Sequence, residues 1–256
     1  MPSSPDKRLA GRRILVTRPL HQAQRFGALI EGEGGVALCY PGVEIAEPSD
    51  PGLLARTLER LATFEVAVFV SPTAAREGLK RVGRWPASVR VAAVGPGTRA
   101  ELEKHGVLSV VAPEEGADSD ALLRDARFAA LGARRVVIFR GEGGRETLRD
   151  ALVQAGCEVA YAECYRRAKP RDLASLAEEW RRAPADAATF FSATALRNLL
   201  DLLPALRGGL LHAPLFVSHD RIADEARRLG AQQVTTSGPT EREMMAGLLA
   251  YFHGGK

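Results

Sequence analysis

The sequence predicts an α/β fold with two domains, each a doubly wound parallel sheet, and three observations support this prediction. Short β-branched runs alternate with amphipathic helical patterns along the 256 residues. The strand-like runs are apolar throughout instead of alternating with polar residues, which is typical of parallel strands buried on both faces. Several strand and turn motifs also occur twice, which indicates two related domains.

The expected strands are short and are separated by helical patterns. They lie at residues 14–16, 66–70, 89–94, 107–111, 136–139, 187–191, 215–217 and 234–236. Between them, apolar residues recur at i, i+3, i+4 and i+7, as at Leu148, Ala151, Leu152 and Ala155. We therefore expect amphipathic helices that cover each sheet.

An internal repeat sets the expected domain organisation. Residues 12–18 (RRILVTR) resemble residues 134–140 (RRVVIFR), and residues 68–74 (VFVSPTA) resemble residues 189–195 (TFFSATA). The simplest division consists of residues 11–40 with 168–253 as one discontinuous domain, residues 46–162 as the other, and connections at about 41–45 and 163–167. A division into two consecutive halves is the alternative.

Composition and charge narrow the function classes. The net charge of +4 is too small to indicate a nucleic-acid partner. Three cysteines without a CxxC spacing and five scattered histidines indicate neither disulfides nor a metal site. No signal-peptide pattern and no run of about 18 apolar residues is present, so no membrane partner and a cytoplasmic location are expected.

Strand-end turns of small or hydroxyl residues form the first candidate site. Ligands of parallel sheets bind at the carboxyl ends of strands, where helix N-termini offer free N–H groups to anions. Each turn taken alone fits equally well as a simple helix cap. Their occurrence in both halves favours a shared ligand between the domains. The candidates are Ser71, Thr73, Gly95, Thr98, Ser192, Thr194 and Ser218.

A glycine-rich loop follows the expected strand at 136–139 and forms the second candidate site. In the segment 140–145 (RGEGGR), Gly141 and Gly144 allow close backbone approach to a ligand, and Arg140 and Arg145 suit anions. The loop matches neither the Walker A nor the complete GxGxxG pattern, so a nucleotide site is the weaker interpretation. A solvated turn is a further alternative.

Two tyrosines lie in the expected second connection. The phenol of Tyr161 or Tyr165 has the chemistry of a hydrogen-bond donor or weak acid in a cleft. The alternative is a packed ring with one satisfied hydroxyl. Spacing alone does not choose between the two tyrosines.

At these same residues the sequence resembles the uroporphyrinogen-III synthase family, from Arg13 to Leu249. The motifs that carry the resemblance are residues 16–19 (VTRP), 69–71 (FVS), 93–100 (AVGPGTRA), 140–141 (RG), 144–145 (GR), 164–166 (CYR) and 190–192 (FFS). The resemblance implies two flavodoxin-like α/β domains joined by a two-stranded linker, with the substrate in the cleft. It implies that Ser71, Thr98, Arg140 and Ser192 line that cleft.

The resemblance also implies the reaction. The family closes hydroxymethylbilane, which carries eight carboxylates, into uroporphyrinogen III with loss of water and inversion of ring D through a spiro intermediate. No cofactor is implied, and we expect a monomer. Tyr165, in the context Cys164-Tyr165-Arg166, matches the family tyrosine that assists departure of the hydroxyl. Arg18, with the strand-end and loop residues above, is then expected to hold the substrate.

One position departs from the family pattern, and two other function classes compete. Ile222 stands where the second-half turn of the family commonly has Thr, which puts a substrate contact from that hydroxyl in doubt. A non-catalytic two-domain anion-binding module is the main alternative. A sugar-nucleotide-dependent transferase is the other, but it requires an acidic ribose partner that the sequence does not offer near Gly141.

Overall fold

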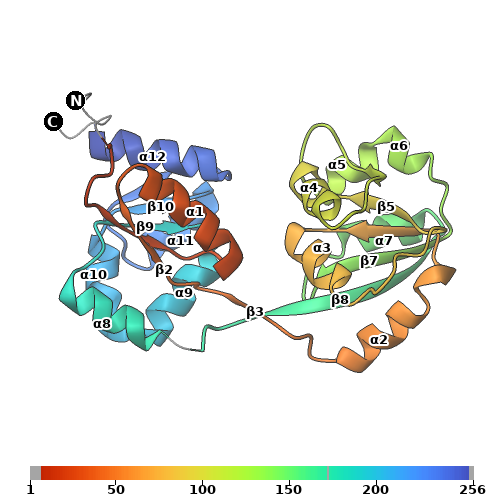
Figure 1. The fold of residues 1–256 in the computed structure, drawn as a ribbon, viewed down its shortest axis with the longest axis horizontal. Helices are drawn as coiled ribbons and strands as arrows, with labels where there is room; N and C mark the ends of the chain where they lie inside the picture. Colours follow the sequence, from red (N-terminus) through yellow and green to blue (C-terminus); the bar gives the residue numbers. More distant parts are fainter. Residues whose placement is uncertain (1–6, 172, 254–256) are drawn as a thin grey trace. The chain divides into compact units, whose positions relative to one another are not determined.

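The computed structural model describes residues 7–171 and 173–253. The chain divides into two compact units: unit 1 takes the described residues of Met1–Glu44 and Ala168–Lys256, and unit 2 is Ile45–Arg167. In Figure 1, unit 1 therefore contains the red and the blue ends of the colour scale, and unit 2 contains the orange to green middle of the chain.

Unit 1 is built on a five-stranded parallel sheet with the order β11-β10-β9-β1-β2. Its strands are β1 (Arg13–Val16), β2 (Val36–Cys39), β9 (Ala187–Phe190), β10 (Leu215–Val217) and β11 (Val234–Thr236). Its helices are α1 (Leu20–Gly32), α8 (Ala174–Arg182), α9 (Ala193–Leu202), the 3₁₀ turn η2 (Pro204–Leu206), α10 (Arg207–His212), α11 (Asp220–Arg228) and α12 (Glu241–His253).

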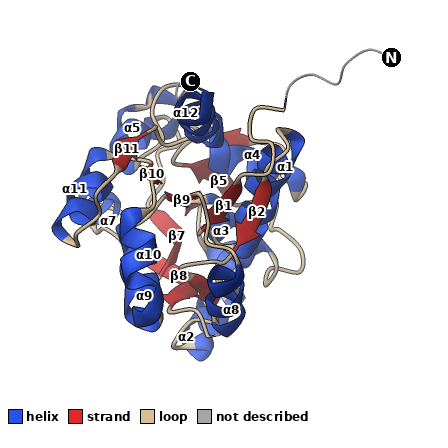
Figure 2. Cartoon of the chain, turned by 90° about the vertical axis from the view of Figure 1, so that its left-hand side faces the viewer, coloured by secondary structure: helices blue, strands red, loops and turns tan. Residues whose placement is uncertain are grey.

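Both faces of this sheet are covered, which is why its strands are apolar throughout. In β1, Leu15 packs with α8, α9, α10 and α11, whereas Ile14 and Val16 pack with α1 and α12. All three side chains are fully buried. Figure 2 shows strands with helices on both sides. The predicted α/β class with parallel sheets is confirmed.

Unit 2 has a six-stranded sheet with the order β3-β8-β7-β4-β5-β6. Its strands are β3 (Glu44–Ala46), β4 (Val66–Phe69), β5 (Arg90–Ala93), β6 (Val110–Val111), β7 (Arg135–Gly141) and β8 (Glu158–Ala168). Its helices are α2 (Pro51–Glu59), the 3₁₀ turn η1 (Leu61–Thr63), α3 (Pro72–Leu79), α4 (Pro96–Lys104), α5 (Ser119–Arg124), α6 (Ala126–Ala129) and α7 (Thr147–Gln154). Helices α2, α3 and α4 share one core, and α5, α6 and α7 share the other.

The two sheets share one strand order with different chain connections. From one edge, unit 1 reads β2-β1-β9-β10-β11, and unit 2, after β3, reads β8-β7-β4-β5-β6. The repeated motifs occupy equivalent places, because β1 corresponds to β7 and β9 corresponds to β4. Unit 2 is thus a circular permutation of the arrangement in unit 1.

Residues 163–167, which we expected in a connection, belong to β8. This strand pairs with β7 as far as Gly141 opposite Tyr165, so these residues are part of the sheet of unit 2. The chain leaves unit 2 at Arg167 and enters it at Ile45, near the ends of β8 and β3.

Candidate functional site

The carboxyl ends of the unit 2 strands border a pocket of about 440 Å³. Ser71 follows β4, Gly141 ends β7, and Tyr165 lies near the end of β8. The loop from Gly143 to Arg145 and the first turn of α7 complete this side of the pocket. The location is the one where open parallel sheets generally bind their ligands.

A β-bulge in β8 brings Tyr165 to the pocket. The pairing with β7 shifts between Arg140, opposite Glu163, and Gly141, opposite Tyr165, so that Cys164 is the extra residue. As a result, Cys164 and Tyr165 pack in the same core, although consecutive strand residues normally point to opposite faces. Tyr165 is only 2% exposed yet lines the pocket.

The hydroxyl of Tyr165 has two polar neighbours in the described part of the chain. The Oγ of Ser71 lies 3.4 Å away, and Nη2 of Arg167 donates to the phenol oxygen at 3.5 Å. Ser71 is also the N-cap of α3, because its Oγ accepts a 3.0 Å hydrogen bond from the N–H of Ala74. One serine thus links the start of the helix to the phenol.

The predicted loop glycines make room for side chains of the protein. A Cβ on Gly141 would lie 2.6 Å from Cζ of Tyr165, and a Cβ on Gly144 would lie 2.8 Å from Nη2 of Arg140. Both distances are well inside van der Waals contact. The two glycines therefore leave the space that the tyrosine ring and the arginine side chain occupy at the pocket wall.

Arg140 lines the pocket but already has protein partners. Its guanidinium is stacked 4.4 Å from the Tyr161 ring and donates to Oε1 of Glu146 at 2.9 Å and to the carbonyl of Gly141 at 3.2 Å. The residue is 3% exposed. Arg140 thus ties β7, β8 and the start of α7 together behind the pocket surface.

Glu146 and Tyr161 share a short hydrogen bond. The Tyr161 hydroxyl donates to Glu146, and this bond, followed by the bond from Arg140, lowers the pKa of the carboxyl. Burial, with the bond to Glu146, raises the pKa of the Tyr161 phenol to about 12. The Tyr161 proton is therefore already donated to the Glu146 carboxylate. Tyr165 is the better placed phenol for chemistry in the pocket.

The thiol of Cys164, next to Tyr165, is unreactive. Burial raises the pKa of the Cys164 thiol to about 12. Its S–H donates to the carbonyl of Ala162 at 3.1 Å. A thiol held protonated in this way is a poor nucleophile.

Three further arginines on the pocket wall have few partners. Within residues 7–171 and 173–253, Arg145 makes no hydrogen bond or ion pair, and Arg149 forms one ion pair, with its neighbour Asp150 at 3.5 Å. The hydrogen bond and the ring contact of Arg167 are both with Tyr165. Planar guanidinium groups bind carboxylates in a bidentate manner. This wall is therefore suited to an anionic ligand.

Three of the predicted residues in unit 2 lie outside this pocket. Thr73 and Thr98 are buried, at 7% and 3% exposed, and neither is among the lining residues. Gly95 is packed against Ala117, whose Cα would lie 2.7 Å from an added Cβ. These three residues contribute to the packing of helices α3 and α4.

The four predicted residues in unit 1 form a separate set. Arg18 is paired with Glu241 at 3.1 Å and Gln22 at 2.9 Å. Ser192 is the N-cap of α9 without a side-chain bond to the helix, and Ser218 is buried. Thr194 accepts a 3.5 Å hydrogen bond from Arg197.

Ile222, the departure from the family pattern, is a core residue. It is 5% exposed and packs with α8, α9 and α10 in unit 1. The apolar side chain therefore fits its surroundings, where an unpaired hydroxyl would be unfavourable.

Several side chains that line the pocket were not predicted from the sequence. Arg149 lies in the first turn of α7, and Asp118 and Asp120 lie at the start of α5. Arg167 adjoins the motif that contains Tyr165, and this proximity was the only available signal. The acidic residues carried no such signal. In the sequence Asp118 has the pattern of an ordinary N-cap, and in the structure it caps α5 by accepting a hydrogen bond from the N–H of Ala121.

Two absences among the described residues concern metal ions and membranes. No group of three or more His, Cys, Asp or Glu side chains there is arranged to hold a metal ion. No helix within residues 7–171 and 173–253 combines the length and apolarity that crossing a bilayer requires.

Comparison with known proteins identifies the relatives of the chain. The family model described as "Uroporphyrinogen-III synthase HemD" matches residues 24–246. The uroporphyrinogen-III synthase of Salmonella typhimurium is 30% identical over 239 residues, covering 91% of this chain and 97% of that protein. The Escherichia coli enzyme of the same name is 29% identical, with the same coverage.

Solved structures show the same fold. Uroporphyrinogen-III synthetase from Helicobacter pylori matches with a TM-score of 0.61 and 14% identity, covering 94% of this chain and 99% of that chain. A mutant uroporphyrinogen III synthase from Thermus thermophilus matches with a TM-score of 0.58 and 19% identity, covering 95% and 100%.

Proposed function

The chain belongs to the uroporphyrinogen-III synthase family, and we propose that it converts hydroxymethylbilane into uroporphyrinogen III with loss of water and inversion of ring D. The observation that best supports this proposal is the unit 2 pocket, where the Tyr165 hydroxyl lies beside arginines that have few protein partners. Members of the family are enzymes of the cyclising lyase kind.

The charge of the pocket fits the proposed substrate. Hydroxymethylbilane carries eight carboxylates, and Arg145, Arg149 and Arg167 offer guanidinium groups at the pocket wall. Ser71 and the N-terminus of α3 supply hydroxyl and N–H groups near the same place. We assign Arg145, Arg149 and the N–H groups of α3 to the acetate and propionate arms.

Tyr165 is the proposed proton donor. Departure of the terminal hydroxyl as water requires a proton, and it leaves an electrophilic azafulvene. Attack through the substituted carbon of ring D gives a spiro-pyrrolenine, which fragments and closes again with ring D inverted. The remaining task of the protein is to hold the chain of pyrroles in the conformation that favours this route over direct closure.

Further assignments form part of the same proposal. We propose that residues 11–40 with 168–253 act as one domain and that residues 46–162, together with the rest of strand β8, act as the other, with Arg18, Ser192, Thr194 and Ser218 as substrate contacts in the first. The protein is proposed to work as a cytoplasmic monomer without a cofactor or nucleic-acid partner.

The enzyme is favoured over the competing function classes. Curated relatives that match nearly their whole length are named as synthases, which supports catalysis over an anion-binding module. The glycine loop that suggested a sugar nucleotide is occupied by protein contacts, since Gly144 faces Arg140 and Gly141 faces Tyr165.

A coupled turnover assay tests the proposal. Hydroxymethylbilane is generated in situ, the products are oxidised to porphyrins, and type I and type III isomers are separated by chromatography. Type III product that is absent without the protein is the expected result. Type I product alone, from a folded sample, would refute the proposal and favour the anion-binding module.

A further inference from the structure

We propose that Ser71 and Arg167 are positioning residues that fix the hydroxyl of Tyr165 so that its proton points into the pocket. The catalytic meaning of this arrangement rests on the proposed function, but the arrangement itself is a property of the pocket. It would make Tyr165 a hydrogen-bond donor toward whatever ligand the pocket holds.

Arg167 lies beside Tyr165 on strand β8. The two residues are two positions apart, after the bulge, and therefore share one face of the strand. Nη2 of Arg167 lies 3.5 Å from the phenol oxygen, and its guanidinium carbon lies 5.7 Å from the ring centre. A guanidinium only donates hydrogen bonds, so the phenol oxygen must be the acceptor.

Ser71 supplies a second donor to the same oxygen. Its Oγ already accepts the N–H of Ala74 at 3.0 Å, and its own proton is free to point elsewhere. The Tyr165 oxygen lies 3.4 Å away; either oxygen of this pair can be the donor, and our proposal assigns the proton to Ser71. A phenol oxygen that accepts from both Ser71 and Arg167 keeps its own proton for another acceptor, and Tyr165 lines the pocket where a ligand would offer one.

The chemistry balances without another reactant. In the proposed reaction, Tyr165 gives its proton to the departing hydroxyl, the carbon–oxygen bond breaks, and water leaves. The resulting phenolate keeps two hydrogen bonds, one of them from the positively charged Arg167, and hydrogen bonds to charged groups are the stronger kind. The proton released from the ring D carbon in the final closure restores the phenol.

Arg167 has one other plausible task, which is to bind a substrate carboxylate directly. The two tasks differ in their kinetic signature. A residue that acts through Tyr165 lowers kcat and has no further effect once the phenol is gone, whereas a carboxylate contact raises KM independently of Tyr165.

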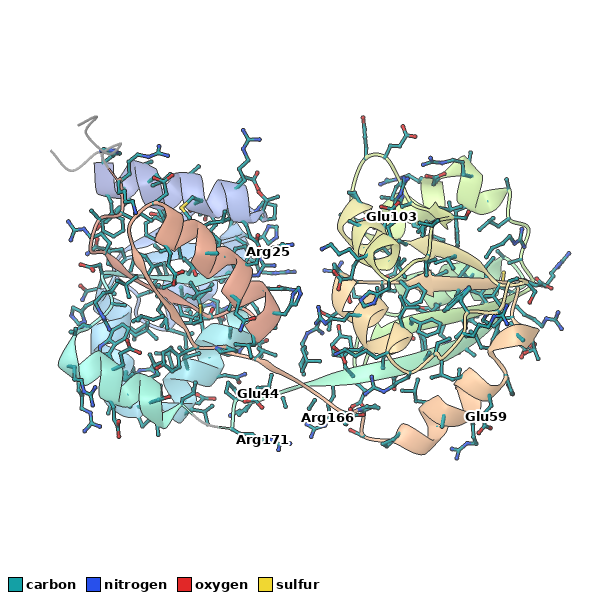
Figure 3. The ribbon with its side chains drawn as sticks, viewed as in Figure 1. Arg25, Glu44, Glu59, Glu103, Arg166 and Arg171 are labelled. Carbon is teal, nitrogen blue, oxygen red and sulfur yellow. The ribbon has the colours of Figure 1, made fainter. Side chains whose placement is uncertain are left out.

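The first test does not depend on turnover. The protein contains four tyrosines, and 3-fluorotyrosine labelling gives each a ¹⁹F resonance, with that of Tyr165 assigned by its loss in Tyr165→Phe. Arg167→Met is expected to shift this resonance, and the control Arg166→Met is not, because neighbouring residues of a strand point to opposite faces. Figure 3 labels Arg166 near the end of β8. An unmoved resonance in Arg167→Met would overturn the proposal, whatever the activity.

The second test is a double-mutant cycle in the isomer assay. Arg167→Met is expected to lower kcat about 10-fold, as loss of one charged hydrogen bond does, with Arg167→Lys recovering part of it. In the Tyr165→Phe background, Arg167→Met should add nothing. Multiplied losses, or an effect confined to KM, would assign Arg167 to substrate binding and overturn the proposal. Absence of type III product from the wild type would instead refute the proposed function, and the fluorine result would stand by itself.

Discussion

Gly141→Ala is the most direct perturbation of the pocket, because the new methyl group meets the catalytic candidate. An added Cβ would lie 2.6 Å from Cζ, 2.7 Å from Cε2 and 3.0 Å from the hydroxyl oxygen of Tyr165. Carbon atoms in contact are normally about 3.5–4.0 Å apart, so the ring would have to withdraw by about 1 Å. Tyr165 is 2% exposed, and the core packed around its ring resists this movement.

The expected magnitudes follow from this geometry. Overpacking of a core costs about 1–3 kcal/mol, which corresponds to a fall of roughly 3–12 °C in the melting temperature of a unit of this size. Displacement of a reacting group by about 1 Å lowers the rate about 100-fold. Both effects are expected together, because the same ring movement causes both.

Gly83→Ala, in the same unit, is the matched control. A Cβ at Gly83 would have no neighbouring atom within 4 Å. Type III synthesis and thermal unfolding are measured for both variants. If Gly141→Ala equals Gly83→Ala in rate and melting temperature, then Tyr165 does not sit against Gly141 in the working protein, and the account of the pocket is wrong.

Three other changes test separate parts of the site. Tyr165→Phe should lower type III turnover about 100-fold, as loss of a general acid does, with an unchanged melting temperature; unaltered turnover would contradict its role. Arg145→Gln should raise KM about 10-fold through loss of a charged contact, while Arg84→Gln, which removes the same charge outside the pocket lining, should not. Glu146 has a pKa held below its ordinary 4.5, so its stabilisation is present above pH 4.5 and is lost as pH falls below it. The melting temperature of wild type should therefore exceed that of Glu146→Gln at pH 7, and the difference should shrink as the pH falls below 4.5; a difference that does not depend on pH would show that the charge plays no part.

The sequence was informative about the fold where burial is complete. Strands such as β4 and β7 are apolar in nearly every position because helices cover both faces of the sheet, and this pattern predicts parallel strands directly. The strand β8 was missed because charged residues interrupt it at Glu158, Glu163 and Arg166 and because Val159 is its one β-branched residue. It lies between β7 and the three-residue strand β3, and parts of it are exposed.

The pocket was predictable only in part, for a similar reason. Ser71 and Arg145 were predicted because they follow expected strands, and Tyr165 was chosen through the family resemblance; all three line the pocket. Thr73 and Thr98 occupy comparable turns but face the core, and that choice depends on how each helix is rotated against the sheet. The β-bulge that turns Tyr165 toward the pocket depends on pairing across strands, which a linear sequence does not display.

The circular permutation between the two units also fixes the order in which they become able to fold during synthesis. Strand β1 lies between β2 and β9, but about 170 residues separate Val16 from Ala187 along the chain. At a translation rate of about 5–20 residues per second, β1 therefore waits roughly 10–35 s for its neighbour. Unit 2 is complete within that interval, while the apolar β1 and α1 have only β2 to shield them. The N-terminal segment is thus the part of the newly made protein most in need of protection by a chaperone.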